Sequence, residues 1–110
     1  MERRFGFRAR TDFGVVAREG TLSAHCRAVE LSSTGIVLDR GHPVQPRDER
    51  ILIPLELRLP ERHRTIRAIG RHVRSFGSRQ CLKFIRIHDA DRLSLAEHLD
   101  LCHLRGTPLS

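Results

Sequence analysis

The sequence predicts a mainly β protein, an antiparallel β-barrel of about six strands with a C-terminal α-helix. Short runs rich in apolar and β-branched residues are separated by turns containing Gly, Pro or Ser, which is typical of strands joined by hairpins. After residue 88 the apolar residues recur at every third or fourth position instead of every second, which indicates a helix. The length of 110 residues, without an internal repeat or linker, favours a single domain.

The expected elements follow one another with short connections. Residues 1–10 show no periodicity and are expected to form a flexible, arginine-rich N-terminal arm, while residues 105–110 are expected to form a tail. Residues 11–104 are expected to form the barrel domain, with its helix at about 90–104. The strands are expected at residues 11–17, 22–31, 36–38, 51–59, 65–76 and 80–87.

Alternation and turn residues predict the first three strands. Phe13 and Val15 lie on one face of the first strand, and the Arg-Glu-Gly sequence after it predicts a turn. The second strand ends at Leu31. Three hydroxyl residues and Gly35 then predict another turn, because Ser and Thr bond the backbone locally and Gly permits a positive φ. Residues 39–50, which contain glycine and proline, are expected to form a loop.

The fourth strand has the clearest period of two. Pro54 lies inside it and has no N–H to donate, which predicts that this strand lies at a sheet edge or carries a bulge at the proline. The alternating apolar residues are Ile51, Ile53, Leu55, Leu57 and Leu59.

The fifth strand contains a change of phase. Ile66 and Ala68 alternate out of phase with Ile69 and Val73, and a bulge near Gly70 would reconcile the two sets. A Gly-Ser turn then leads into the last strand.

The C-terminal helix is predicted from its caps and its apolar stripe. Asp89 or Asp91 can cap its N-terminus, and the glycine and proline after residue 105 end it. The stripe consists of Leu95, Leu99 and Cys102, with Leu93 and Ala96 beside it.

Charge narrows the classes of partner. The net charge is +7, and Lys83 is the single lysine among 20 basic residues. Arginine grips phosphate with parallel donors and stacks on rings, so the bias suits an anionic ligand or partner. Nucleic acid is disfavoured, because aromatic residues make up only 5% of the chain and no recognition motif is present. For the arginine-rich residues 61–79, an acidic protein partner and a solvated hairpin both remain open.

The sequence favours a cytoplasmic location. No apolar run approaches the roughly 18–20 residues that a membrane span needs, and the charged N-terminus does not resemble a signal peptide. The three cysteines have no metal-site or disulfide spacing, so free thiols are expected.

The turn between the second and third strands is the candidate binding site. Glu30, Ser32 and Gly35 are expected to lie together at one rim of the barrel. A carboxylate and a hydroxyl beside exposed backbone can read the edge of a purine. Arg4 and Arg8 lie four residues apart in the arm, with a third arginine at Arg3, and such arginines can bend around one ligand, donating to phosphate and stacking on bases.

Together these two segments resemble the PilZ domain family, whose signature is RxxxR followed by (D/N)xSxxG. This chain has Arg-Arg-x-x-x-Arg at positions 3, 4 and 8, and Glu-x-Ser-x-x-Gly at positions 30, 32 and 35. The segment from Cys81 to Ile85 resembles the family's Gly-x-x-Phe strand, with Cys81 in place of glycine. The resemblance covers Glu2 to about Leu101. It implies a six-stranded antiparallel barrel followed by a helix, and the bacterial second messenger cyclic di-GMP as ligand.

The resemblance also implies residue roles. Arg4 and Arg8 would clamp the phosphates and stack on or bond the guanines, with Arg3 as the frequent extra arginine. Ser32 and Gly35 would supply a hydroxyl contact and a close backbone approach.

Glu30 departs from the family pattern, which has Asp or Asn at this position. Its carboxylate can still accept from guanine N–H groups, but the extra methylene moves it by about 1.5 Å. A misplaced charged acceptor loses ~1–3 kcal/mol, roughly tenfold to a hundredfold in affinity.

The expected function is non-enzymatic binding of cyclic di-GMP, relayed to a protein partner through ordering of the N-terminal arm. The alternative is a degenerate PilZ-like adaptor that binds no nucleotide and acts through protein contacts, a reading that Glu30 favours and the three arginines disfavour. No nucleophile elbow or paired carboxylates indicate catalysis, and no cofactor is expected. His98 and Cys102 are four residues apart on the helix, but two ligands do not make a metal site. A monomer or a homodimer is expected.

Overall fold

The computed structural model describes residues 8–45, 48, 50–60 and 65–104, and these form a closed barrel capped by one helix. The strands are joined in the order β1-β2-β3-β6-β5-β4, and every neighbouring pair is antiparallel. The predicted fold class is therefore confirmed. The elements are β1 (Ala9–Glu19), β2 (Leu22–Leu31), β3 (Gly35–Asp39), β4 (Leu52–Arg58), β5 (Ile66–Phe76), β6 (Arg79–Ile87) and α1 (Asp89–Leu104).

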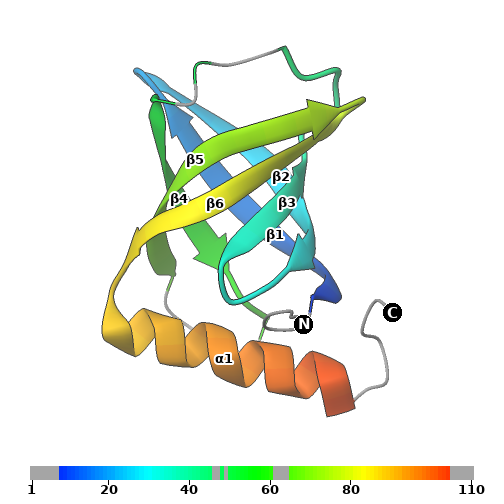
Figure 1. The fold of residues 1–110 in the computed structure, drawn as a ribbon, viewed down its shortest axis with the longest axis vertical. Coiled ribbons are helices and arrows are strands. Elements are labelled where there is room, and N and C mark those ends of the chain that lie inside the picture. Colours follow the sequence, from blue (N-terminus) through cyan, green and yellow to red (C-terminus); the bar gives the residue numbers. More distant parts are fainter. Residues whose placement is uncertain (1–7, 46–47, 49, 61–64, 105–110) are drawn as a thin grey trace, which may run out of the picture.

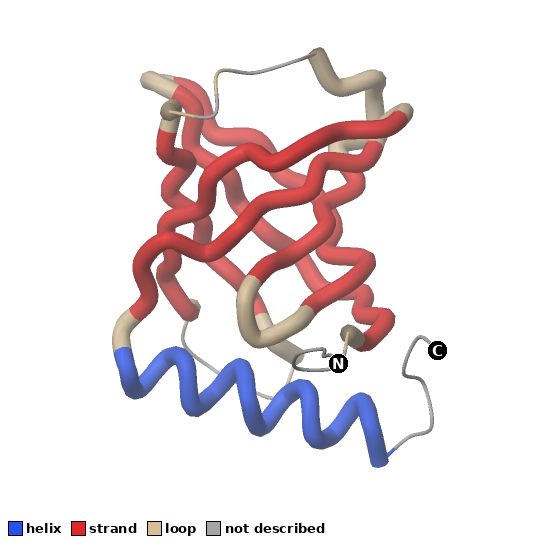
Figure 2. The backbone as a smooth tube through the Cα atoms, viewed as in Figure 1, coloured by secondary structure: helices blue, strands red, loops and turns tan. Residues whose placement is uncertain are grey.

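Helix α1 lies across one end of the barrel, on the side of the β2–β3 turn (Figure 1). Figure 2 shows the strands as a continuous wall, with the helix outside one opening. Alternate strand residues face inward and form one apolar core, and α1 adds Leu95 and Leu99 to it. Closure leaves none of the six described strands at a free sheet edge. No helix in the described part of the chain is long and apolar enough to cross a membrane.

Strand β1 begins earlier than the sequence predicted. Ala9 and Arg10 were expected in the arm, but they pair with Leu31 and Glu30 of β2. Ala9 is fully buried, so the strand gains apolar contacts by extending to it. Of the expected arm, residues 1–7 lie outside the described residues.

Strand β4 confirms the predicted alternation with one correction. Ile53, Leu55 and Leu57 are buried, whereas Ile51 precedes the strand and is 53% exposed. The expectation of a sheet edge or a bulge at Pro54 is wrong, because β4 pairs with both β1 and β5 and its register with β5 passes through Pro54 without a shift. The β1 ladder ends at Leu55, however, so position 54 has no β1 partner that needs an N–H.

The β5–β6 register shifts near Gly70, where the sequence predicted a bulge in the fifth strand, but β6 carries the extra residue. The pairing shifts between Ile69 and Gly70, and Ile85 of β6 is left without a partner. Strand β5 keeps its own alternation there, with Gly70 and His72 facing inward. Ile69 and Val73 therefore belong to the outer face, which explains their opposite phase.

Helix α1 buries the predicted stripe but not the apolar residues beside it. Leu95, Leu99 and Cys102 are buried as expected, but Leu93 is 63% exposed and Ala96 is also exposed. Polar residues share the covered face instead, namely Asp91, Ser94 and His98. The ring of His98 packs edge-on against Phe13 at 5.4 Å between centroids.

The predicted aspartate caps are not the N-cap of α1. The His88 carbonyl accepts from Arg92 N at 2.8 Å, so His88 occupies the N-cap position. Asp89 and Asp91 lie in the first turn, where their charge is favourable toward the helix dipole.

The barrel end opposite α1 is closed by a buried polar chain. Arg40 donates to Glu19 Oε1 at 2.6 Å and to Gln80 Oε1 at 3.1 Å, and Gln80 Nε2 donates to His72 Nδ1 at 3.1 Å. His72 is thus a hydrogen-bonded core residue. Cys26 is also a buried core residue, and burial raises the pKa of its thiol.

Candidate functional site

The β2–β3 turn is held by its own serine. Ser32 Oγ accepts from Thr34 N at 3.2 Å and from Gly35 N at 3.1 Å, while Ser32 N donates to Gly35 O at 3.0 Å. These bonds form a hydroxyl-capped turn of the kind that the sequence suggested. Ser32 is only 9% exposed, so its hydroxyl is directed into the corner, whereas Ser33 and Thr34 are exposed. The corner is therefore open to solvent at its tip.

Gly35 is required by close packing and not by a left-handed φ. The described glycines with positive φ are Gly20, Gly41 and Gly77, and Gly35 is not among them. A Cβ at position 35 would lie 2.6 Å from the carbonyl oxygen of Leu82 in β6. Any side chain here would force β3 away from β6.

A bulge in β2 directs Glu30 outward. Ala28 pairs with Leu38 and Glu30 with Val37, so Val29 is the extra residue. Without this residue Glu30 would follow the inward phase of Ala28; with it, Leu31 points inward instead and is 1% exposed. At the same irregularity, Thr11 Oγ1 donates to the Ala28 carbonyl at 2.8 Å.

Glu30 faces Arg8 at the start of the described chain. Arg8 Nη1 lies 3.8 Å from Glu30 Oε1, and the two side chains are 62% and 20% exposed. Within the described residues, Glu30 Oε1 is buried and has no hydrogen-bond partner. A buried carboxylate oxygen without a donor is unfavourable, so this atom would gain from a ligand that supplies an N–H group.

These residues line one pocket of about 380 Å³ beside the corner. The structure thus brings together four of the predicted site residues: Arg8, Glu30, Ser32 and Gly35. The predicted Arg3 and Arg4 lie outside the described residues.

Arg74, Val73 and Cys81 also line the pocket, although the sequence did not single them out for this site. The β5–β6 pairing shifts between His72 and Arg74, so Val73 is an extra residue in β5 and is 57% exposed. Arg74 lies over the ring of Phe76, 5.9 Å from its centroid. The out-of-phase Val73 was the available sequence signal, because bulges often re-aim side chains beside binding sites.

His98 and Cys102 contact each other inside the fold. Cys102 Sγ lies 3.6 Å from His98 Nε2, and both side chains are buried. The described residues contain no group of three or more His, Cys, Asp or Glu side chains placed to hold a metal ion.

Comparison with solved structures identifies proteins of similar fold. The inhibitor of motility of Bacillus subtilis (MotI/DgrA) superposes with a TM-score of 0.79 at 18% identity, covering 96% of this chain. This chain spans 53% of that protein, about half of its length. The PilZ domain of CeSA from a cellulose-synthesizing bacterium gives a TM-score of 0.60 at 14% identity, covering 90% of this chain and 97% of that one. An uncharacterized Legionella protein, Lpg0364, gives 0.50 at 20% identity, covering 91% and 95%.

At the level of sequence, no family model matches the chain, and a search of curated proteins finds no relative. The structural similarities, at identities of 14–20%, concern the fold alone. They extend over 90–96% of this chain, and therefore over most of the barrel and the terminal helix. The chain therefore has a PilZ-like barrel fold.

Proposed function

We propose that this protein is a non-enzymatic receptor that binds cyclic di-GMP at the pocket beside the β2–β3 corner. The observation that carries the proposal is the convergence of Arg8 and Glu30 on one pocket with the Ser32 turn. The chain supplies these residues from separate segments, and two bulges direct Glu30 and Arg74 toward the same pocket.

The pocket's chemistry matches a purine dinucleotide with two phosphates. Arg8 and Arg74 provide two guanidinium groups that can pair with phosphate oxygens or stack on bases. Glu30 Oε1, which accepts no hydrogen bond within the described residues, can accept from the N–H groups on a guanine edge. Val73 adds an exposed apolar surface against which a base can lie.

The Arg8–Glu30 contact sets a small energetic cost on ligand entry. Exposed ion pairs contribute about 0.2–1 kcal/mol, so moving Arg8 from Glu30 to a phosphate weakens affinity by about fivefold at most. A charge-assisted bond to phosphate contributes about 1.5–3 kcal/mol and offsets that cost. Arg8 is therefore poised to exchange one anionic partner for another.

The output that we propose is contact with a protein partner. Arg3 and Arg4 belong to residues 1–7, and in this proposal they join Arg8 on the ligand. A segment ordered by a ligand offers a partner a surface that the free protein does not have. The location that we propose is the cytoplasm, in keeping with a diffusible nucleotide signal.

A nucleotide-free adaptor is the second candidate, and two observations favour it. Ser32 Oγ is already engaged by two turn amides, and Glu30 stands where the PilZ signature has Asp or Asn. Isothermal titration with cyclic di-GMP distinguishes the two candidates.

Isothermal titration with cyclic di-GMP tests the proposal. We expect the wild type to bind and Arg8→Ala to weaken binding at least about tenfold, because one charge-assisted phosphate contact is lost. Arg74→Ala should weaken binding by a similar factor, and Arg4→Ala should also do so if the N-terminal segment closes on the ligand. Arg86→Ala is the matched control, because it removes the same charge from an exposed position outside the pocket.

An affinity that falls equally in Arg86→Ala would mean that only net charge matters. A wild type that gives no heat at high micromolar ligand would reject nucleotide binding and leave the adaptor.

A further inference from the structure

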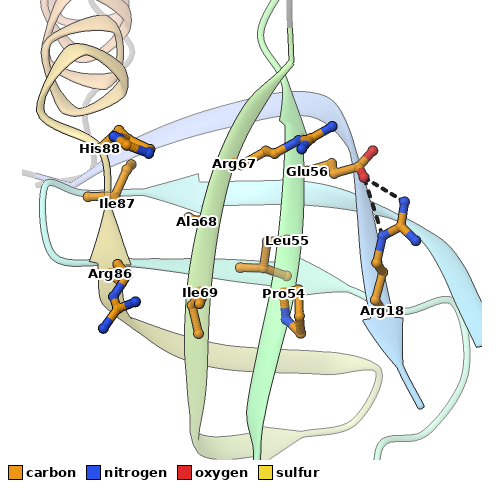
Figure 3. Close-up of a pocket in the computed structure, with 10 residues that line it drawn as sticks. All are labelled: Arg18, Pro54, Leu55, Glu56, Arg67, Ala68, Ile69, Arg86, Ile87 and His88. Carbon is orange, nitrogen blue, oxygen red and sulfur yellow. Dashed lines mark hydrogen bonds and ion pairs between the residues drawn. The ribbon is translucent and has the colours of Figure 1, made fainter. Parts of the chain in front are cut away.

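A second pocket, distinct from the corner site, lies on the outer wall of the barrel where β4, β5 and β6 run side by side (Figure 3). Its volume is about 400 Å³. The strand register places Pro54, Ile69 and Arg86 in one row across the three strands, with Glu56 paired to Arg67 beside it. The pocket is lined by Arg18, Pro54, Leu55, Glu56, Arg67, Ala68, Ile69, Arg86, Ile87 and His88.

The pocket lies where the wall is irregular. The β1–β4 ladder ends at Leu55, and the β6 bulge leaves Ile85 unpaired next to Arg86. Bulges increase local twist and re-aim the neighbouring side chains. The row from Pro54 to Ile69 thus forms an apolar floor that stays reachable from solvent, since Pro54 is exposed and Ile69 is half-buried.

The rim carries excess positive charge. Three guanidinium groups surround the floor, against the single carboxylate of Glu56. Glu56 is already engaged, because it accepts from Arg18 at 2.8 Å and 3.3 Å, a contact drawn in Figure 3. Within the described residues, the side chains of Arg67 and Arg86 form no hydrogen bond or ion pair, although Arg67 lies close enough to Glu56 to lower its pKa, and His88 is exposed beside them.

An apolar floor inside a cationic rim is complementary to a short acidic segment that also carries an aliphatic side chain. Carboxylates pair with arginine through two parallel bonds, and an aliphatic group gains from covering the floor. A nucleic acid fits less well. Among the described residues that line the pocket there is no Phe, Tyr or Trp ring for base stacking, only the imidazole of His88, and a phosphate backbone has no aliphatic group for the floor.

We infer that this outer-wall pocket docks an acidic, leucine-type peptide segment of a partner protein. The inference does not depend on nucleotide binding. Along β5, Ile69 in this pocket and Arg74 in the corner site are five residues apart, about 16 Å at the usual strand rise. The two sites therefore share a strand without sharing a residue.

Fluorescence anisotropy tests the inference with a labelled peptide of sequence Gly-Glu-Glu-Leu-Glu-Glu-Gly, titrated with the full chain up to about millimolar concentration. We expect saturable binding that Arg67→Glu/Arg86→Glu weakens at least about tenfold. Replacing the peptide's leucine with serine should also weaken binding, because the floor then loses its apolar contact.

The matched control is Arg74→Glu/Arg79→Glu. It reverses one exposed arginine on β5 and one on β6, changes the net charge equally, and leaves this pocket intact. It should alter peptide affinity by less than about twofold. Unchanged thermal unfolding of the Arg67→Glu/Arg86→Glu protein separates lost docking from lost fold.

Three results would overturn the inference. One is no saturable change in anisotropy with the wild type. Another is equal weakening by both double variants, which would indicate attraction by net charge alone. The third is tighter binding of a short oligo-thymidylate that is lost with Arg67 and Arg86, which would indicate a nucleic-acid surface instead.

Discussion

At the scale of single residues, the Glu-x-Ser-x-x-Gly motif contains residues with two different roles. Gly35 and Ser32 serve the fold, and Glu30, in our proposal, serves a ligand. Gly35 is explained by the fold, because its missing side chain lets β3 approach the Leu82 carbonyl of β6. Ser32 is explained by the turn, because its hydroxyl oxygen accepts hydrogen bonds from two backbone amides of that turn. Glu30 is explained by neither, because its Oε1 atom is buried without a hydrogen bond among the described residues. It is therefore the member of the motif whose environment points to a ligand.

Shortening this carboxylate tests that interpretation. Glu30→Asp restores the Asp of the PilZ signature. It draws the charge back by about one bond length and so weakens the contact of the carboxylate with Arg8. We expect cyclic di-GMP to bind about tenfold more tightly, as measured by isothermal titration. Glu56→Asp, on the outer wall, is the control and should leave the affinity unchanged. Unchanged or weaker binding by Glu30→Asp would mean that glutamate has its own geometry in this site.

At the scale of the elements, regular strands were predictable, but the residues that form the bulges were not. The bounds of β2 were predicted without error, and the alternation of β4 placed Ile53, Leu55 and Leu57 in the core. The extra residues Val29 and Val73 could not be placed, because a bulge is defined by the register of the partner strand and not by local sequence. The candidate corner was found from its motif, whereas Arg74 was missed because only the bulge brings it there.

The close contact of β3 with β6 predicts a cost for any side chain at position 35. Gly35→Ala places a Cβ 2.6 Å from a backbone oxygen that cannot move aside alone. We expect a loss of about 1–3 kcal/mol in the free energy of unfolding, measured by urea denaturation. Gly14→Ala provides the control, since nothing lies within 4 Å of its added Cβ, and its stability should be unchanged or raised by about 0.4–1 kcal/mol. Equal stabilities of the two variants would contradict the packing role of Gly35.

At the scale of the whole molecule, the barrel separates its polar features. One end holds the buried chain from Glu19 through Arg40 to Gln80, and the other end is covered by α1. The corner pocket and the outer-wall pocket occupy different parts of the wall between them. Periodicity predicted the barrel and its helix, because each depends on one apolar face. It could not predict the pockets, which arise from irregular register and from side chains of strands distant in sequence.

Surface ion pairs link the stability of the whole barrel to pH. The Arg18 guanidinium holds the pKa of Glu56 below its ordinary value, mainly through its hydrogen bonds. A depressed carboxyl pKa stabilises the fold above the unfolded value of about 4.3, and this contribution disappears as pH falls through the folded value. Arg18→Met should therefore lower the urea midpoint at about pH 7, and the difference from wild type should shrink toward about pH 3. A difference that stays constant over this range would show that Arg18 acts through packing.

The most direct test of the central claim is to locate cyclic di-GMP on the protein by NMR. A titration of ¹⁵N-labelled protein should shift the backbone amides of Arg8, of the corner from Glu30 to Gly35, and of Arg74 and Cys81, with the outer-wall residues Ile69 and Arg86 much less affected. Shifts confined to other parts of the barrel, or none at saturating ligand, would contradict the assignment of this corner as the nucleotide site.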